Sequence, residues 1–219
     1  MNFTCLATGS DGNAYLLESD EAVLIIEAGK GTFKKIIAAI PDNKKVIGVI
    51  YSHHHNDHCG DLESLNKIFD LLQFDEKDKY QDEHFIIKRF EVWHNVTCYG
   101  FAIFCKDEKK TLVFLTDFAK LIDKSFYWLK VDFLAIELNY NSMLYSKLTD
   151  EQKRGLEWHC SDFHSVGIMR KLFESNRDMK AVTLHKSDRA CNNSLTNRAL
   201  YKNFGLRAEI VSVGRKYHF

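Results

Sequence analysis

A short run of histidines near residue 55 carries the strongest chemical signal in the chain. Residues 53–58 read HHHNDH, and they follow the apolar run 46–51 after a single serine. Because residues two apart point to the same side of an extended segment, His53 and His55 can bind one metal ion together. Asp57 and His58 lie just beyond, within reach of a second ion. Neutral imidazole and carboxylate are ligands that suit Zn²⁺ and other first-row metals.

The plain alternative is a chance polar loop or an engineered histidine tag. Tags are longer, lie at a terminus and lack the interleaved Asp57. A chance loop would also not need the strand-like run before it and the helical pattern after it. We expect His54 to point away from its neighbours, toward solvent. Cys59 fits a small residue packed behind the loop better than a ligand.

Three further candidates each follow a predicted strand. His94 follows the strand at 85–93, Asp117 follows 111–115, and His185 follows 181–184. Alone, each of these histidines also fits an ordinary surface residue, and the aspartate fits a turn or a helix cap. Because strand ends gather at one edge of a sheet, their joint placement predicts that these groups converge.

Periodicity and turn signals predict a mixed order of strands and helices. The expected strands are 3–7, 14–18, 22–26, 46–51, 85–93, 101–105, 111–115, 133–137, 181–184 and 209–213. The expected helices are 32–40, 61–72, 162–174 and 195–204, and residues 75–83 are expected to form an exposed loop. This order predicts an α/β protein of two packed sheets with helices outside, in a single domain over residues 1–219.

The amino-acid composition of the chain limits which classes of binding partner are expected. The chain has 219 residues, with 30 basic and 30 acidic side chains, so no general attraction to nucleic acid or membrane follows. No apolar run approaches the roughly 18 to 20 residues that a membrane span needs. Six scattered cysteines without a Cys-x-x-Cys pair predict free thiols and a cytoplasmic protein. The oligomeric state stays open.

The layout resembles the metallo-β-lactamase superfamily, whose fold is an αββα four-layer sandwich. The resemblance extends from Thr8 to Val213, and residues 53–58 match the hallmark motif of the family, His-x-His-x-Asp-His. It implies two divalent metal ions, with Zn²⁺ expected first and Mn²⁺ or Fe²⁺ as alternatives. The implied ligands are His53, His55 and His94 for one ion, Asp57, His58 and His185 for the other, and Asp117 for both.

Four shorter segments resemble the single-domain, nuclease-like WalJ branch of that superfamily. They are TGSDGN at 8–13, IELNY at 136–140, HCSD at 159–162, and the histidine at 185 with the asparagine pair at 192–193. The chain departs from the pattern of the branch at Cys160 and Asp162, and in a longer gap before the asparagine pair. These departures concern the substrate rather than the metals.

Such a site would hydrolyse its substrate without a serine or cysteine nucleophile. Two metal ions about 3.5 to 4 Å apart activate water and stabilise charge on the attacking and leaving oxygens. Asp57 would orient that water. His159 would act as an acid or contact a phosphate, since it precedes a predicted helix that Ser161 could cap. A purely structural contact is the alternative for His159.

The expected substrate is a phosphodiester, in DNA, in RNA or in a smaller molecule, and the nuclease-like resemblance carries this expectation. A thioester, a lactone or another ester or amide is the alternative within the same fold. A third interpretation is a catalytically silent metal-binding protein, for which zinc would raise stability without hydrolysis of any ester.

Overall fold

The computed structural model describes residues 1–219, and the chain forms two compact units. The first unit consists of Met1–Arg89, Ile103–Lys110 and Ser212–Phe219. The second consists of Phe90–Ala102 and Thr111–Val211. The expected single domain stays a prediction.

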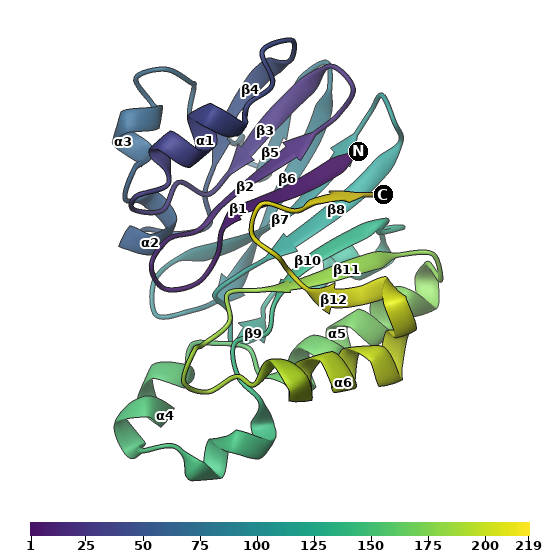
Figure 1. The fold of residues 1–219 in the computed structure, drawn as a ribbon. Helices are drawn as coiled ribbons and strands as arrows, with labels where there is room; N and C mark the ends of the chain where they lie inside the picture. The colour runs from purple at the N-terminus through teal and green to yellow at the C-terminus, as the bar shows by residue number, and fades with distance from the viewer. The chain divides into compact units, whose positions relative to one another are not determined.

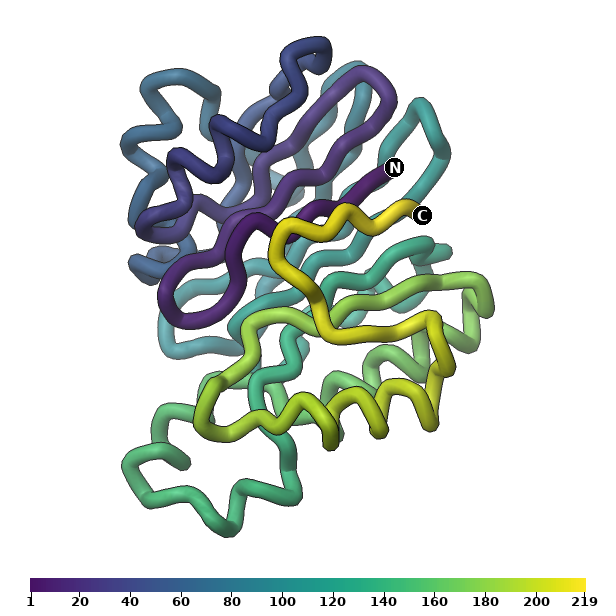
Figure 2. The backbone as a smooth tube through the Cα atoms, viewed as in Figure 1, coloured from purple at the N-terminus to yellow at the C-terminus, as the bar shows by residue number.

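The first unit is built on a five-stranded sheet with the order β13-β1-β2-β3-β4. Its strands are β1 (Asn2–Ala7), β2 (Ala14–Glu18), β3 (Ala22–Ile26), β4 (Lys45–Ile50) and β13 (Lys216–His218). The strands from β13 to β3 are antiparallel, and β4 joins β3 in parallel. The two ends of the chain lie together, because Asn2 pairs with His218 (Figure 2).

Helix α1 (Phe33–Ala39) lies against β1 and β2 (Figure 1). It begins after Thr32 and ends before Pro41, as the sequence predicts. Beneath it, a core forms from apolar side chains of the sheet, of α1 and of α3 (Leu62–Leu65). Burial of such side chains is the main force that holds helix and sheet together. The core includes Leu16, Val23, Ile25, Ile36, Val49 and Leu65.

The helix predicted at 61–72 is wrong beyond Leu65, where α3 ends. The backbone instead joins the edge of β4. The Val49 N–H donates to the carbonyl of Asp70 (2.9 Å), and the Leu72 N–H donates to the carbonyl of Val49 (3.1 Å). Gly48 has room for Leu72 only because it lacks a Cβ, which would lie 2.5 Å from Asp70 O and from the Leu72 side chain. Tertiary pairing therefore overrides the helical periodicity.

The loop predicted at 75–83 is also partly wrong, because it contains the short strand β5 (Lys79–Gln81). This strand pairs antiparallel with β6 (Phe85–Trp93). Asp75 shapes the turn before it by accepting hydrogen bonds from the backbone of Lys77 and Lys79. Charged residues are typical of an edge strand, since they discourage further pairing.

Within the second unit the strand order is β12-β11-β10-β8-β7-β6, with β9 (Lys120–Leu121) beside β6. The other strands are β7 (Cys98–Cys105), β8 (Lys110–Leu115), β10 (Phe133–Glu137), β11 (Lys180–Leu184) and β12 (Ala208–Ile210). The strands from β8 to β12 are parallel. Their carboxyl ends therefore meet at one edge, which is where open α/β sheets place functional groups.

Two long helices complete the second unit, α5 (Asp162–Ser175) and α6 (Asn193–Phe204). The unit also contains the short 3-10 helices η1 (Ser125–Trp128), η2 (Ser142–Lys147) and η3 (Gly205–Arg207). Apolar side chains of α5 and α6 share one core with the sheet. Helix α4 (Asp150–Leu156) is not among the helices predicted from the sequence, although Thr149 and Gln152 form a capping box, a signal visible in the sequence.

All six cysteines are free thiols, as predicted. No helix has the length and apolar character needed to cross a membrane.

Candidate metal centre

The histidine run leaves the end of β4 and enters the short helix α2 (Asn56–Cys59). His53 is buried and His55 half-buried, and Nε2 of His53 lies 2.9 Å from Nδ1 of His55. Nitrogen ligands of a tetrahedral zinc site, each about 2.0 to 2.1 Å from the ion, are roughly 3.3 Å apart. The two rings therefore present their nitrogen atoms to one point, with nearly the spacing of two ligands.

The next two candidates lie beside each other on α2. Oδ2 of Asp57 is 3.3 Å from Nε2 of the fully buried His58. Asn13 supports both of them, since its Nδ2 lies 3.1 Å from His58 Nε2 and 3.4 Å from Asp57 Oδ2. Asn13 belongs to the turn between β1 and β2, so this turn helps to position Asp57 and His58.

Glu27 is a site residue that the sequence analysis missed. Its carboxylate is fully buried and accepts hydrogen bonds from the Ser52 N–H at 3.3 Å on both oxygens. Oε2 also lies 3.4 Å from Nδ1 of His58. Glu27 has a positive φ of 66°, which turns its side chain at the end of β3 toward the loop. A lone carboxylate directly after a fully apolar strand is the signal that could have identified it.

Backbone contacts hold the histidine loop against residues 27–30. The Ala28 N–H donates to the carbonyl of His58 at 2.8 Å, and the Asn13 N–H donates to that of Asp57 at 2.7 Å. A Cβ on Gly29 would lie 2.0 Å from Asp57 O and 2.5 Å from Asn13 N. Only glycine allows this approach, so Gly29 fixes the backbone position of Asp57.

His54 and Cys59, which lie next to ligand candidates in the sequence, have surroundings different from those of the candidates. His54 is exposed, and its Nε2 lies 3.0 Å from the Tyr51 hydroxyl, as expected for a histidine that faces solvent. Burial, followed by the nearby Glu27 carboxylate, raises the pKa of the Cys59 thiol. Its half-buried position fits the expected small residue packed behind residues 53–58.

The second unit gathers its own group at the carboxyl edge of the parallel strands. Ligand atoms of Asp117, Glu137, His159 and His185 all lie within 4.8 Å of one another. Asp117 and His185 leave their strands in the left-handed region, with φ of 46° and 49°. Such a conformation costs energy in a residue other than glycine and is typical of functional sites. It brings Asp117 Oδ1 to 2.8 Å from His185 Nδ1.

Glu137 is the second residue that the sequence analysis left without a role. Its buried carboxylate accepts hydrogen bonds from the backbone N–H groups of Phe118 (3.0 Å) and Cys160 (3.2 Å). Oε1 also lies 2.7 Å from Nδ1 of His159 and 3.3 Å from Nδ1 of His185. Burial alone would raise the pKa of Glu137, but the charge and hydrogen bond of His159, with that of His185, hold it below its usual value.

His159 lies just before α5, which Ser161 caps as predicted by accepting from the His164 N–H. Its side chain stays 19% exposed, so a ligand can reach it. Burial would lower the pKa of His159, but the carboxylates of Glu137 and Asp117 outweigh that effect and raise it.

His94 is buried, and its Nδ1 lies 3.0 Å from the carbonyl oxygen of Trp158. This contact favours the tautomer that keeps a lone pair on Nε2, which lies 3.9 Å from Asp117 Oδ2. Burial outweighs the Asp117 carboxylate and lowers the pKa of His94. The neutral ring that results is the form that binds a metal.

These donors fit divalent metal ions, because both units offer buried imidazole nitrogens and carboxylate oxygens at short mutual distances. The seven ligand candidates predicted from the sequence divide between the two units. The first unit provides His53, His55, Asp57 and His58, and the second provides His94, Asp117 and His185.

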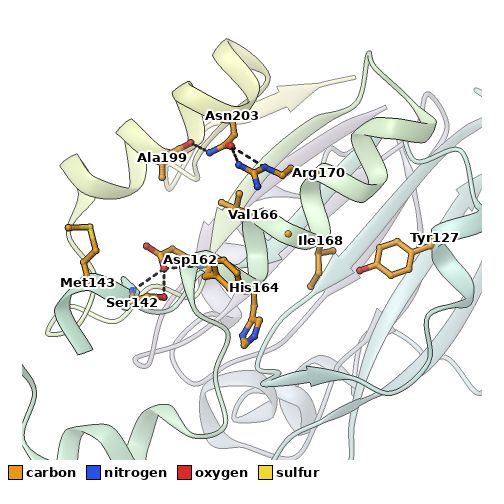
Figure 3. A pocket seen from close by; sticks show the side chains of 12 residues that line it. Tyr127, Ser142, Met143, Asp162, His164, Val166, Ile168, Arg170, Ala199 and Asn203 are labelled. Atoms are coloured by element: carbon orange, nitrogen blue, oxygen red, sulfur yellow. Dashed lines mark hydrogen bonds between the residues drawn. The ribbon is translucent and has the colours of Figure 1, made fainter. Parts of the chain in front are cut away.

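A separate pocket of about 560 Å³ lies along α5 in the second unit (Figure 3). Its lining includes Tyr127, Phe163, His164 and Arg170, and Arg170 donates to the side chain of Asn203. None of the ligand candidates lines this pocket, so it is distinct from the candidate metal centre.

Comparison with known proteins gives matches in sequence. A family model described as the metallo-beta-lactamase superfamily matches residues 7–117. "Exodeoxyribonuclease YycJ" from Bacillus anthracis is 33% identical over 93 residues, which are 39% of this chain and 34% of that protein. The matched region thus spans about a third of the length of the relative.

Solved structures resemble the chain over nearly its whole length. The metallo-beta-lactamase fold protein YhfI from Bacillus subtilis has a TM-score of 0.74 and 17% identity, and the match covers 99% of this chain and 98% of that one. The short form of human tRNase Z has a TM-score of 0.68 and 15% identity, with 100% and 99% covered. At such identities the likeness concerns the fold alone. It confirms the predicted α/β fold of the metallo-β-lactamase type.

Proposed function

The chain belongs to the metallo-β-lactamase superfamily, and we propose that it is a metal-dependent hydrolase of phosphodiester bonds, acting as a nuclease or phosphodiesterase. The observation that carries the proposal is the clustering, within each unit, of buried and half-buried histidines and carboxylates at or just after strand ends. Buried polar groups of this kind are retained mainly where a site needs them.

We propose that the two groups act together on a pair of divalent ions, with the partition that the sequence resemblance implies. One ion would take His53, His55 and His94, the other Asp57, His58 and His185, and Asp117 would contact both. When bound, the ions supply Lewis acidity, which activates water and stabilises negative charge on a phosphate. Zn²⁺ is the first expectation, and Mn²⁺ and Fe²⁺ suit the same donors.

Two side chains would handle protons and orientation. Asp57, held by Asn13 and beside His58, would orient the attacking water. His159 would donate a proton from Nε2 to the leaving oxygen, since Glu137 engages its Nδ1 and stabilises the protonated ring. In this role the buried Glu137 carboxylate would orient the His159 ring for proton transfer.

The choice of phosphodiesters draws support from the partial match to an exodeoxyribonuclease, together with the WalJ-like segments of the sequence. The fold alone would not license it, because one fold serves many chemistries. The free thiols of all six cysteines fit a reducing compartment, so we place the activity in the cytoplasm.

The test combines metal content with hydrolysis of bis(p-nitrophenyl) phosphate. We would compare wild type, His58→Ala, and His54→Ala as the matched control from the same run. His54 is exposed, and its ring is hydrogen-bonded to Tyr51. Removal of this ring should therefore leave metal content and hydrolysis unchanged. His58→Ala should lower metal content and abolish hydrolysis.

Each outcome separates the alternatives. About two ions per chain with hydrolysis lost only in His58→Ala would support a binuclear phosphodiesterase. Metal binding without phosphodiester cleavage would direct the search to thioesters and lactones. Metal binding that raises stability, with no ester cleaved at all, would identify a silent metal-binding protein.

A further inference from the structure

Two tryptophan side chains lie next to each other beside the second unit's ligand group. The rings of Trp93 and Trp158 have centroids 4.8 Å apart at an angle of 39°. Each tryptophan directly precedes a histidine of the candidate centre, His94 or His159. The contact between His94 Nδ1 and the Trp158 carbonyl ties the two segments together. The tryptophan pair is therefore held in a fixed place relative to these histidines.

Trp93 is exposed to solvent, and Trp158 is half-buried beside it. Along the end of β6, Phe90 and Val92 are buried while Glu91 and Trp93 point outward, as the alternation of a strand requires. Trp93 keeps 39% of its surface exposed. A partly exposed tryptophan that packs on a second one beside a candidate catalytic centre offers a flat aromatic surface to a ligand.

A lysine adds positive charge at this place. Lys120 pairs with Trp93 across the strands β9 and β6, and its Nζ lies 5.2 Å from the centroid of the Trp93 ring. Lys120 is exposed and has no carboxylate within ion-pair distance, so its charge is available to an anion. Its flexible stem can move the ammonium from the ring to a nearby phosphate.

We propose that Trp93, Trp158 and Lys120 form a stacking platform for bases of a single-stranded nucleic acid, flanking the phosphodiester to be cleaved. The proposal rests on the proposed function, because it makes the substrate of that centre a nucleic acid strand. Aromatic rings stack on bases of any sequence, while a lysine contacts the backbone. The bases of a duplex are already stacked on one another, so the platform favours single strands.

The test measures binding of two phosphorothioate-linked oligonucleotides of equal length, one of thymidine units and one of abasic units, to metal-loaded protein. Loss of one stacked base is expected to weaken binding about 5- to 100-fold. Wild type should therefore prefer the thymidine strand by such a factor. In Trp93→Ala the preference should fall to less than about twofold, whereas Trp93→Phe should keep most of it.

Two further variants separate the roles of ring and charge. Trp128→Ala is the matched control, because Trp128 is 92% exposed on η1 and belongs neither to the platform nor to the candidate metal centre. This substitution should leave the preference for the thymidine strand unchanged. Lys120→Gln should weaken binding of both strands alike and reduce the slope of log affinity against log salt by about one.

The outcomes separate this proposal from the proposed function. Equal binding of both strands by wild type, or an unchanged preference in Trp93→Ala and Trp93→Phe, would overturn the platform even if bis(p-nitrophenyl) phosphate is cleaved. A base preference that depends on Trp93 would support the platform even if no phosphodiester were cleaved, and the proposed function would then fail alone.

Discussion

Nδ1 of His159 lies 2.7 Å from Oε1 of Glu137, and this carboxylate is completely buried. Two backbone N–H groups, from Phe118 and Cys160, hold the other oxygen of Glu137. The carboxylate therefore cannot rotate freely, and it fixes the plane of the His159 ring. A partly exposed imidazole with one nitrogen held in this way has its second nitrogen available for substrate.

The first prediction concerns Glu137→Gln. An amide cannot stabilise the protonated ring as a carboxylate does, so proton donation by His159 should weaken. Loss of a general acid typically costs about 10²- to 10⁴-fold in rate. The loss in kcat should be large for an oligonucleotide, whose leaving oxygen needs a proton. It should be small for bis(p-nitrophenyl) phosphate, whose leaving group departs without one.

A double substitution tests whether the two residues act as one unit. His159→Asn alone should reproduce the substrate-dependent loss, and His159→Asn with Glu137→Gln should be little slower than either change alone. If both substrates slow equally in Glu137→Gln, the carboxylate supports the fold or the metals, and the acid role of His159 is wrong.

The second prediction concerns Asp117, the ligand proposed to contact both ions. Asp117 has a φ of 46°, a conformation that asparagine tolerates better than alanine. Asp117→Asn should therefore keep the fold while metal content, measured by mass spectrometry, falls from about two ions per chain to about one or fewer. Hydrolysis should be abolished. Full metal content and activity in both Asp117→Asn and Asp117→Ala would refute the two-metal proposal.

The third prediction concerns Glu27, which lies 3.4 Å from His58 Nδ1. A carboxylate behind a ligating histidine orients the ring and raises its basicity, and its loss typically weakens metal affinity about 10- to 100-fold. Glu27→Gln should show this loss in competition with a chelator of known affinity. The Ser52 N–H can still bond to the amide oxygen, so the unfolding transition of the metal-free protein should change little. Unchanged affinity would assign Glu27 to the fold alone.

The strands that the sequence predicts to the residue are those whose signal is local. Residues 14–18, 22–26 and 133–137 are mainly apolar runs, and the structure places strands at these positions. The helix expected to reach residue 72 fails because residues 70–72 pair with β4, a contact that no local pattern contains.

The residues of the candidate site likewise divide into those with a local signal in the sequence and those without one. Asp117 and His185 could be identified because each follows a strand, and parallel pairing with β10 brings those strand ends together. The position of Glu27 after an apolar strand could have marked it as a candidate, but the roles of Glu27 and Glu137 depend on partners far along the chain. Glu27 and Ser52 are 25 positions apart in the sequence, and Glu137 and His159 are 22 positions apart, so only the fold brings each pair together.

The last prediction contrasts two glycines. Gly29→Ala should destabilise the protein by roughly 3 kcal/mol or more, at the severe end for single substitutions, because its Cβ would overlap the backbone of Asp57 and Asn13. Metal affinity should fall with it, since the histidine loop must move. Gly155→Ala is the matched control on α4, where a Cβ meets nothing within 4 Å.

In that control, alanine should stabilise the helix by about 0.5 to 1 kcal/mol, the usual advantage over glycine in a helix. Denaturant unfolding of the metal-free proteins measures both changes in the free energy of unfolding. Competition with a chelator measures the metal affinities. A Gly29→Ala protein as stable as wild type would show that residues 27–30 do not hold the histidine loop by close backbone contact. Equal losses in both variants would mean that glycine flexibility, rather than space, is what matters at residue 29.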